Sequence, residues 1–146
     1  MHGYSQLRLG RQSLDNQVYL LTFTTHMRVK HFQKWENARR LSQCIESGTI
    51  QKESKVLCWV IMPDHVHLLM QLGNSDTISN YIRRLKAGVK RQLLINDKLW
   101  AKGFHDRAIR KESELLPAAR YIVANPLRAG LVKSVNDYPF WNSVWV

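Results

Sequence analysis

The sequence predicts an α+β fold in which helices cover one face of an antiparallel sheet. Short runs rich in β-branched and aromatic residues alternate with stretches of helical apolar spacing, and a Pro-Asp pair joins two of the runs directly. The 146 residues are enough to bury a core without disulfides. We expect one domain over residues 1–146, with a basic N-terminal arm at 1–16 and a C-terminal tail at 132–146.

The first strand and helix follow from residue type and spacing. Residues 18–24 are dense in β-branched and aromatic side chains, which favours a buried strand. Residues 33–47 carry apolar side chains three and four positions apart, which predicts a helix that ends at Gly48. The apolar stripe of this helix consists of Trp35, Ala38, Leu41 and Ile45.

A hairpin should follow this helix. Residues 56–62 and 65–71 both have strand composition, and only Pro63 and Asp64 separate them. Proline fixes φ for the second position of a type I turn, so the chain is expected to fold straight back. The second strand of the hairpin therefore begins at the first residue after the turn.

The remaining elements complete a β-α-β-β-α-β order. Residues 78–95 have a helical apolar stripe preceded by Ser75-Asp76-Thr77, whose side chains can cap the helix, and residues 104–110 read as a fourth strand. Ser113 can cap a last helix that contains Tyr121. This order predicts a ferredoxin-like (RRM-like) sheet with helices on one face, followed by a C-terminal helix that bears a tyrosine.

Charge gives the first indication of function. The chain has 22 Lys and Arg against 11 Asp and Glu, a net charge of +11 with neutral histidines, and a pI near 10.1. A small domain this basic attracts polyanions, of which nucleic acids are the commonest in the cytosol. Nucleic-acid binding is the expected consequence.

Other classes are disfavoured by composition. The N-terminus lacks a signal-peptide pattern, and no apolar run approaches the roughly 20 residues that span a bilayer. Cys44 and Cys58 lack the spacing of a redox or zinc motif. We therefore expect a soluble cytoplasmic protein that associates with the nucleoid through DNA.

Two histidines in the hairpin form the first candidate site. Successive side chains of a strand point to opposite faces, so His65 and His67 share one face while Val66 takes the other. Two neighbouring imidazoles supply half of a metal site. Unrelated surface or core histidines remain the alternative for so short a motif.

Tyr121 and Asn125 form the second candidate site, because residues four apart lie on one helix face. Together with the histidines they fit attack by a tyrosine hydroxyl on a phosphodiester held by a divalent cation. A free phenol has a pKa near 10 and gains from a metal that polarises the phosphate. Two imidazoles and one amide oxygen suit Mg²⁺ or Mn²⁺.

Several ordered motifs resemble the single-tyrosine HUH transposases, and within them the REP-associated tyrosine transposases. The resemblance extends over almost the whole chain. The matching segments are Leu7-Arg8-Leu9-Gly10-Arg11, Met62-Pro63-Asp64-His65-Val66-His67-Leu68-Leu69, Trp100 with Phe104-His105-Asp106-Arg107-Ala108-Ile109-Arg110, Tyr121-Ile122, Asn125-Pro126, Gly130-Leu131-Val132 and Tyr138-Pro139-Phe140-Trp141-Asn142-Ser143.

The resemblance implies a role for each site residue. His65 and His67 would bind the metal, and Tyr121 would form a 5′-phosphotyrosine link to DNA while a 3′-hydroxyl is released. Asn125 would complete the metal site, with His105 and Asp64 as alternative third ligands. The implied enzyme is a metal-dependent transposase that nicks and rejoins single-stranded DNA at REP-type hairpins, and a monomer is favoured over a dimer.

The DNA-binding residues are predicted from charge. Arg8 and Arg11 are candidates for contacts from the basic arm. The helix at 78–95 adds five cations in nine residues with no acidic residue among them, which are candidates for the phosphate backbone: Arg83, Arg84, Lys86, Lys90 and Arg91. Some of the tryptophans could stack on bases. These are Trp35, Trp59, Trp100, Trp141 and Trp145.

Three alternatives stay open at this point. A non-catalytic, ferredoxin-like nucleic-acid-binding or regulatory protein would carry aromatic side chains where this chain has His65 and His67. A transposase could use Tyr81 as its nucleophile instead of Tyr121. A metal-dependent phosphodiesterase would use water and leave no covalent product.

Overall fold

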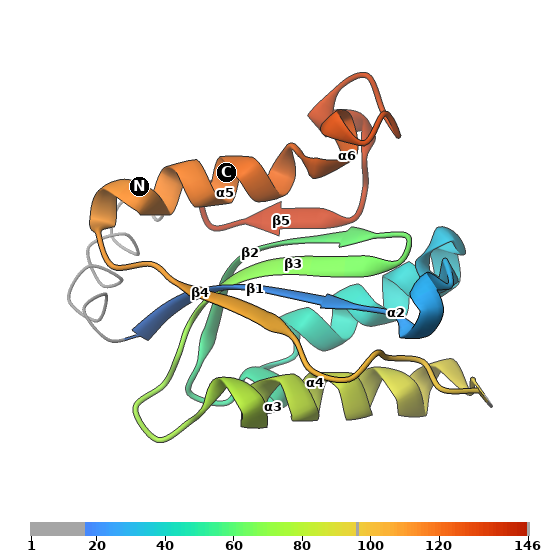
Figure 1. Cartoon of the computed structure of the whole chain (residues 1–146), viewed down its shortest axis with the longest axis horizontal. Coiled ribbons are helices and arrows are strands. Elements are labelled where there is room, and N and C mark those ends of the chain that lie inside the picture. Colours follow the sequence, from blue (N-terminus) through green and yellow to red (C-terminus); the bar gives the residue numbers. More distant parts are fainter. Residues whose placement is uncertain (1–16, 96, 146) are drawn as a thin grey trace.

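The computed structural model describes residues 17–95 and 97–145, which form a five-stranded antiparallel sheet in the order β4-β1-β3-β2-β5 (Figure 1). The predicted strands are present, and the first three lie within one residue of their expected positions. The strands are β1 (Val18–Thr24), β2 (Lys55–Met62), β3 (His65–Gln71), β4 (His105–Ala108) and β5 (Trp141–Ser143).

Helices connect these strands in the predicted order. They are α2 (Trp35–Glu46), α3 (Gly48–Gln51), α4 (Ile78–Leu93), α5 (Leu115–Val123) and α6 (Asn125–Arg128). The Thr77 hydroxyl accepts a hydrogen bond from the Asn80 amide at 3.0 Å, so Thr77 is the one of the three candidate residues that caps α4. Within the described ranges, no helix is long and apolar enough to cross a membrane.

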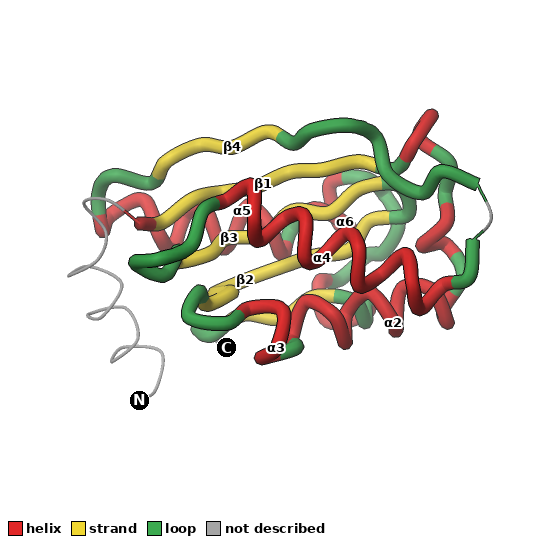
Figure 2. Tube along the Cα trace, turned by 90° about the horizontal axis from the view of Figure 1, so that it is seen from below, coloured by secondary structure: helices red, strands yellow, loops and turns green. Residues whose placement is uncertain are grey.

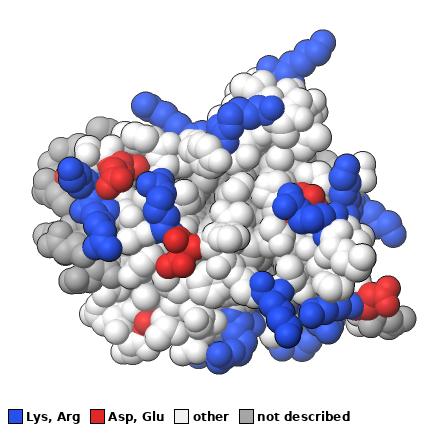
Figure 3. Space-filling view, in the orientation of Figure 1, with Lys and Arg blue, Asp and Glu red and all other residues white. Residues whose placement is uncertain are grey.

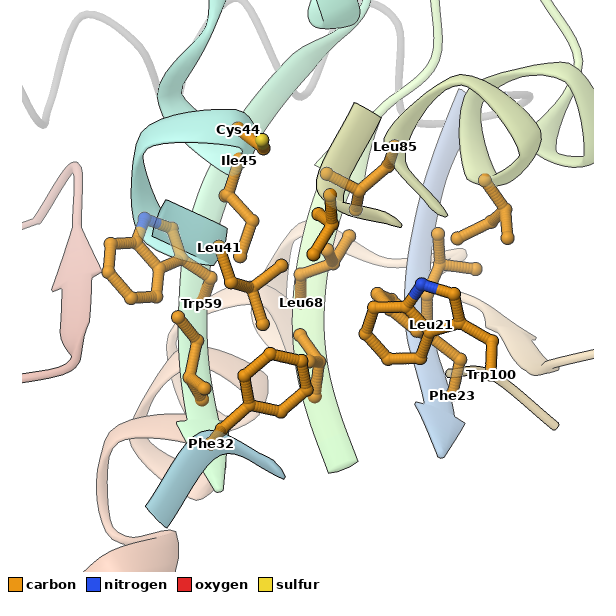
Figure 4. Packing of buried hydrophobic residues seen from close by; sticks show 14 of the residues in the cluster. Leu21, Phe23, Phe32, Leu41, Cys44, Ile45, Trp59, Leu68, Leu85 and Trp100 are labelled. Carbon is orange, nitrogen blue, oxygen red and sulfur yellow. The ribbon is translucent and has the colours of Figure 1, made fainter. Parts of the chain in front are cut away.

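The larger core lies between the sheet and the pair α2 and α4. Leu41 and Ile45 of α2, Leu85 of α4, and Phe23 and Leu68 of the sheet are all buried there (Figure 4). This is the helix layer that the apolar spacing of the sequence predicts. Because each buried aliphatic side chain contributes roughly 1.5–3 kcal/mol, this layer supplies much of the stability of the fold.

The expectation that helices cover one face is correct for α2 and α4, and α5 adds a layer on the other face. Seen from below, α2 and α4 lie in front of the strands and α5 lies behind them (Figure 2). Leu115, Ala119 and Ile122 of α5 form a second core with Val60 and Leu69 of the sheet. Strands buried on both faces explain why β2 reads as an almost continuous apolar run.

Two local expectations are wrong, and Trp35, which the sequence left open between core and surface, is 61% exposed. Gly48 does not follow the helix directly, because α2 ends at Glu46 and Gly48 opens α3. Ser113 lies inside a short 3₁₀ turn at Glu112–Glu114 and does not cap α5.

Part of the expected C-terminal tail is a strand. Residues 141–143 form β5, which pairs with β2 through Val60 and Trp141. The tail thereby covers the edge of β2 that the predicted four-stranded sheet would have left unpaired.

Candidate active site

Strand pairing places the two histidines beside each other on the face that α5 covers. His65 pairs with Thr24 of β1, and His67 pairs with Thr22. Val66 is on the opposite face in the larger core, as the alternation predicts. The two imidazole centroids are 4.9 Å apart.

Each imidazole is held through the same ring nitrogen. His65 Nδ1 lies 2.7 Å from Asp64 Oδ1, and His67 Nδ1 lies 2.8 Å from Thr22 Oγ1. In the tautomer in which Nδ1–H donates each of these bonds, Nε2 has the free electron pair that can bind a metal. A carboxylate behind a histidine, as at His65, is a usual arrangement at protein metal sites.

Both carboxylate oxygens of Asp64 are in hydrogen-bond contact with other side chains of the described residues. Arg28 Nε donates to Asp64 Oδ2 at 3.0 Å, while Asp64 Oδ1 faces His65. Partial burial opposes ionisation, but the bonds to Arg28 and His65 dominate and lower the pKa of Asp64. Asp64 therefore orients His65, which is a role that sequence reasoning did not assign.

The surroundings of His67 keep its ring neutral. Burial lowers the pKa of His67 to about 4, and repulsion from His65 and Arg128 acts in the same direction. At neutral pH the ring is therefore uncharged, and one of its two nitrogens has a free electron pair. A neutral imidazole is the form that binds metal ions.

Tyr121 of α5 lies opposite His67 of β3. It lies near the end of α5 and is half exposed, and its ring centroid is 6.2 Å from that of His67 at an interplanar angle of 74°. The sequence separates these residues by more than fifty positions, so only the packing of α5 on the sheet brings them together.

Arg128 holds Tyr121 and was missed by sequence reasoning. Its guanidinium carbon lies 4.1 Å from the centroid of the Tyr121 ring, and its Nη2 donates to the Tyr121 carbonyl at 2.8 Å. Such cation–π contacts add about 0.5–2 kcal/mol. The spacing of seven residues, two helical turns, was a signal that the sequence did contain.

Asn125 stays on the same side as Tyr121. The helix is interrupted at Ala124 between α5 and α6, and Asn125 Nδ2 donates to the Tyr121 carbonyl at 3.4 Å. This long bond uses the amide nitrogen, which leaves the amide oxygen for a ligand. Asn125 is therefore close to the tyrosine, as the sequence predicts.

His105 is farther from the histidine pair. It pairs with Thr22 of β1, which in turn pairs with His67, so His105 shares their face. Two strand spacings separate it from His67, or about 10 Å. Within the described residues, no group of three or more His, Cys, Asp and Glu side chains could hold a metal ion. The Asn125 amide oxygen, next to Tyr121, has the chemistry of a metal ligand.

Helix α4, which carries the five predicted cations, lies on the opposite face of the sheet (Figure 2). Arg84 forms a two-pronged ion pair with Asp76, and Lys86 donates to the carbonyls of Ala101 and Gly103. These two residues have structural partners. Arg83, Lys90 and Arg91 are exposed, whereas Arg8 and Arg11 lie outside the described residues.

Tyr81, the alternative nucleophile, is fully buried against α2 and the sheet. Burial also raises the pKa of its hydroxyl well above the ordinary value. No phosphodiester can reach this oxygen in the folded chain, so Tyr121 is the better candidate.

The fold is similar to that of two solved transposase structures. A solved REP-associated tyrosine transposase bound to a REP hairpin matches with a TM-score of 0.75 and 23% identity, over 87% of this chain and 76% of that one. A structure described as a candidate transposase from Deinococcus radiodurans matches with a TM-score of 0.51 and 19% identity, over 72% of this chain and 87% of that one.

Sequence comparison gives the family. The model described as "Transposase IS200 like" matches residues 13–125, so the chain belongs to the IS200-like transposase family. The REP-associated tyrosine transposase of Escherichia coli is 30% identical over 87 residues, which cover 59% of this chain and 52% of that protein.

A Haemophilus influenzae protein provisionally given the same name is 33% identical over 102 residues, which cover 60% of this chain and 57% of that protein. The chain thus spans about half the length of the curated relatives it matches.

Proposed function

We propose that this protein nicks and rejoins single-stranded DNA through a covalent 5′-phosphotyrosine on Tyr121, with Mg²⁺ or Mn²⁺ as cofactor. The observation that carries the proposal is the approach of Tyr121 on α5 to His67 on β3, with ring centroids 6.2 Å apart. Membership of the IS200-like transposase family supports the same reaction class.

The proposed step is a transesterification. The Tyr121 oxygen attacks the phosphorus and its phenolic proton is lost, while the bond from phosphorus to the 3′ oxygen breaks and that oxygen gains a proton. Rejoining is the reverse reaction with a 3′-hydroxyl as nucleophile. Arg128 supports the step because it holds the Tyr121 ring and places a positive charge beside the attacking group.

His65 and His67 would hold the metal through Nε2, and Asn125 would add its amide oxygen. A bound divalent cation would polarise the phosphate and stabilise the leaving oxygen. The donor set fits this cofactor, because two neutral nitrogens and one oxygen leave positions for phosphate oxygens and water.

We further propose REP-type hairpins as the substrate and the cytoplasmic chromosome as the place of action. One relative is named as a REP-associated tyrosine transposase, and a solved structure of similar fold holds a REP hairpin. The net charge of +11 suits a polyanionic partner. Lys and Arg outnumber Asp and Glu on the face in Figure 3.

A monomer is the proposed active unit. The helix that carries Tyr121 packs on the sheet of its own chain, and its Ile122 is buried in the same core as Val60 of β2. Tyr121 and His67 lie close together within one chain, which supports an active unit that needs no second copy. A non-catalytic binder is less well supported, because the sheet face that could stack bases carries histidines and is covered by α5.

The test is formation of a covalent adduct. We expect a labelled single-stranded REP-type hairpin and Mn²⁺ to give an SDS-resistant protein–DNA product. Tyr121→Phe removes the attacking oxygen and should abolish the product, and His67→Ala or excess EDTA should reduce it at least a hundredfold by removing the metal. Tyr81→Phe, which changes only a buried tyrosine, is the control and should retain the product.

Two results would contradict the proposal. Adduct formation by Tyr121→Phe would assign the nucleophile elsewhere. Cleavage with no adduct would instead indicate a phosphodiesterase that uses water.

A further inference from the structure

We propose that Trp35 and the loop at 26–34 bind the single strand of DNA next to the reacting phosphate, with a base stacked on Trp35 and phosphates beside Lys30 and Lys34. The inference rests on the proposed single-stranded DNA substrate. It adds a binding site outside the Tyr121 and histidine cluster.

Trp35 differs in exposure from the other tryptophans. Trp59 and Trp100 are buried, Trp141 and Trp145 are partly buried, and Trp35 is 61% exposed. Its ring meets Phe140 edge to face, with centroids 4.7 Å apart at 64°. This contact fixes the indole while leaving most of its surface to solvent, which suits stacking on a base.

Phe140 is itself fixed to the sheet. Its carbonyl accepts a hydrogen bond from the Ile61 amide at 3.0 Å, and its ring is 6.3 Å from that of Tyr138. The Tyr138 hydroxyl donates to the Ile61 carbonyl. Ile61 is one residue from Met62, the strand partner of His65. The exposed indole is therefore anchored at the end of the sheet that carries the histidine pair.

Several residues that directly precede Trp35 in the sequence line a hollow with lysines on its wall. It has a volume of about 320 Å³, and no acidic side chain is among its described lining residues. Lys30 and Lys34 are exposed on its wall, and Lys34 directly precedes Trp35. The acidic neighbour Glu36 is paired with Arg39 and Arg40, which offsets its repulsion of a phosphate.

The loop that carries these lysines is attached to the active site. Arg28 binds Asp64, the Thr25 amide donates to the Asp64 carbonyl at 3.0 Å, and the Phe32 amide donates to the Pro63 carbonyl at 3.0 Å. Positive side chains thus extend from the turn before His65 to Trp35. A single strand fits this surface, because it offers phosphates and unpaired bases at short intervals.

The experiment measures binding without cleavage. Tyr121→Phe protein is titrated with a short oligothymidylate, and intrinsic tryptophan fluorescence and the dissociation constant are followed. We expect quenching that is mostly lost in the added change Trp35→Phe, and binding about tenfold weaker with Trp35→Ala. Trp35→Phe should bind with intermediate affinity because it keeps a smaller ring.

The phosphate contact has its own readout. Lys34→Ala should reduce the slope of log affinity against log salt by about 0.7. Lys52→Ala removes another exposed lysine, which is not among the lining residues of the hollow, and we expect its slope to match the parent. Thermal unfolding of each variant reports whether the fold is intact.

The inference is overturned if Trp35→Phe retains the quenching, or if folded Trp35→Ala binds within twofold of the parent. Neither result depends on the covalent adduct, because the binding experiment uses Tyr121→Phe protein. Trp35-dependent binding without an adduct in the wild type would support this site and contradict the proposed reaction. An adduct with Trp35-independent binding would do the opposite.

Discussion

The two faces of the sheet carry the same pair of residue types, a tyrosine beside an arginine, in different roles. On the α4 face, Tyr81 is fully buried, and its ring lies 5.8 Å from the Arg84 guanidinium. On the α5 face, Tyr121 is half exposed with Arg128 at 4.1 Å. Both are helical tyrosines beside an arginine, yet only Tyr121 can contact a substrate.

The arginines differ in the same way. Arg84 forms an ion pair with Asp76. Asp76 also accepts hydrogen bonds from the Ser54 hydroxyl and the Thr77 amide, so this carboxylate links the start of α4 to the turn before β2. Arg128 contacts Tyr121 through its ring and its carbonyl. The comparison shows that a cation next to a tyrosine indicates a site only where the tyrosine is accessible.

The largest expected effect is on stability at the Arg84 ion pair. The hydrogen bonds from Arg84 lower the pKa of Asp76 from 3.8 to about 2, although partial burial opposes this. A lowered pKa stabilises the fold above pH 4, and this contribution disappears as the pH falls toward 2. Asp76→Asn should lower the free energy of unfolding by about 2 kcal/mol at pH 7 and flatten its decline below pH 4.

Urea unfolding between pH 2 and pH 7 measures this effect. Glu36→Gln is the matched control, because Glu36 pairs with two arginines in full solvent. Such surface pairs contribute little to stability. An equal decrease in the free energy of unfolding in the two variants would mean that the Asp76–Arg84 ion pair stabilises the fold no more than a surface ion pair does.

A smaller effect is expected at Arg128. Arg128→Ala should slow adduct formation about tenfold because the Tyr121 ring loses its cation–π partner. Stability should change little, since Arg128 is exposed. Arg128→Lys keeps the charge without the planar group and should be intermediate.

Single-turnover kinetics measure this effect. Arg120→Ala, which removes an exposed arginine from α5 itself, is the control. An unchanged rate in Arg128→Ala would show that Tyr121 does not need this neighbour.

The smallest effect concerns the buried tyrosine. The Tyr81 hydroxyl is buried without a hydrogen-bond partner among the described residues. Tyr81→Phe should therefore raise the free energy of unfolding by about 1 kcal/mol, because a buried unpaired polar group is removed. Tyr121→Phe, at a half-exposed position, should change it by less than about 0.5 kcal/mol.

Denaturant titration compares these two variants. Destabilisation by Tyr81→Phe would indicate that the hydroxyl has a partner in solution, and would weaken the contrast between the two faces.

Much of the fold follows from local pattern. Side-chain alternation places His65 and His67 on one face, and the Pro63-Asp64 turn sets the hairpin register. The stripe of α4 is equally readable, because helical spacing depends only on nearby residues. Trp35 follows the apolar spacing of α2 and is nevertheless exposed, because the spacing of residues along a helix does not say which other elements cover its first turn.

The sequence by itself determined the histidine pair, the β-α-β-β-α-β order of the first four strands and their main helices, the basic character and the family motifs. The tertiary structure alone decided that α5 packs behind the sheet, that Tyr121 faces His67 with Arg128 on its ring, and that Arg84 has a structural partner. The physical reason is range. Periodicity and turn chemistry act over a few residues, whereas the packing of a helix on a sheet depends on apolar surfaces far apart in the chain.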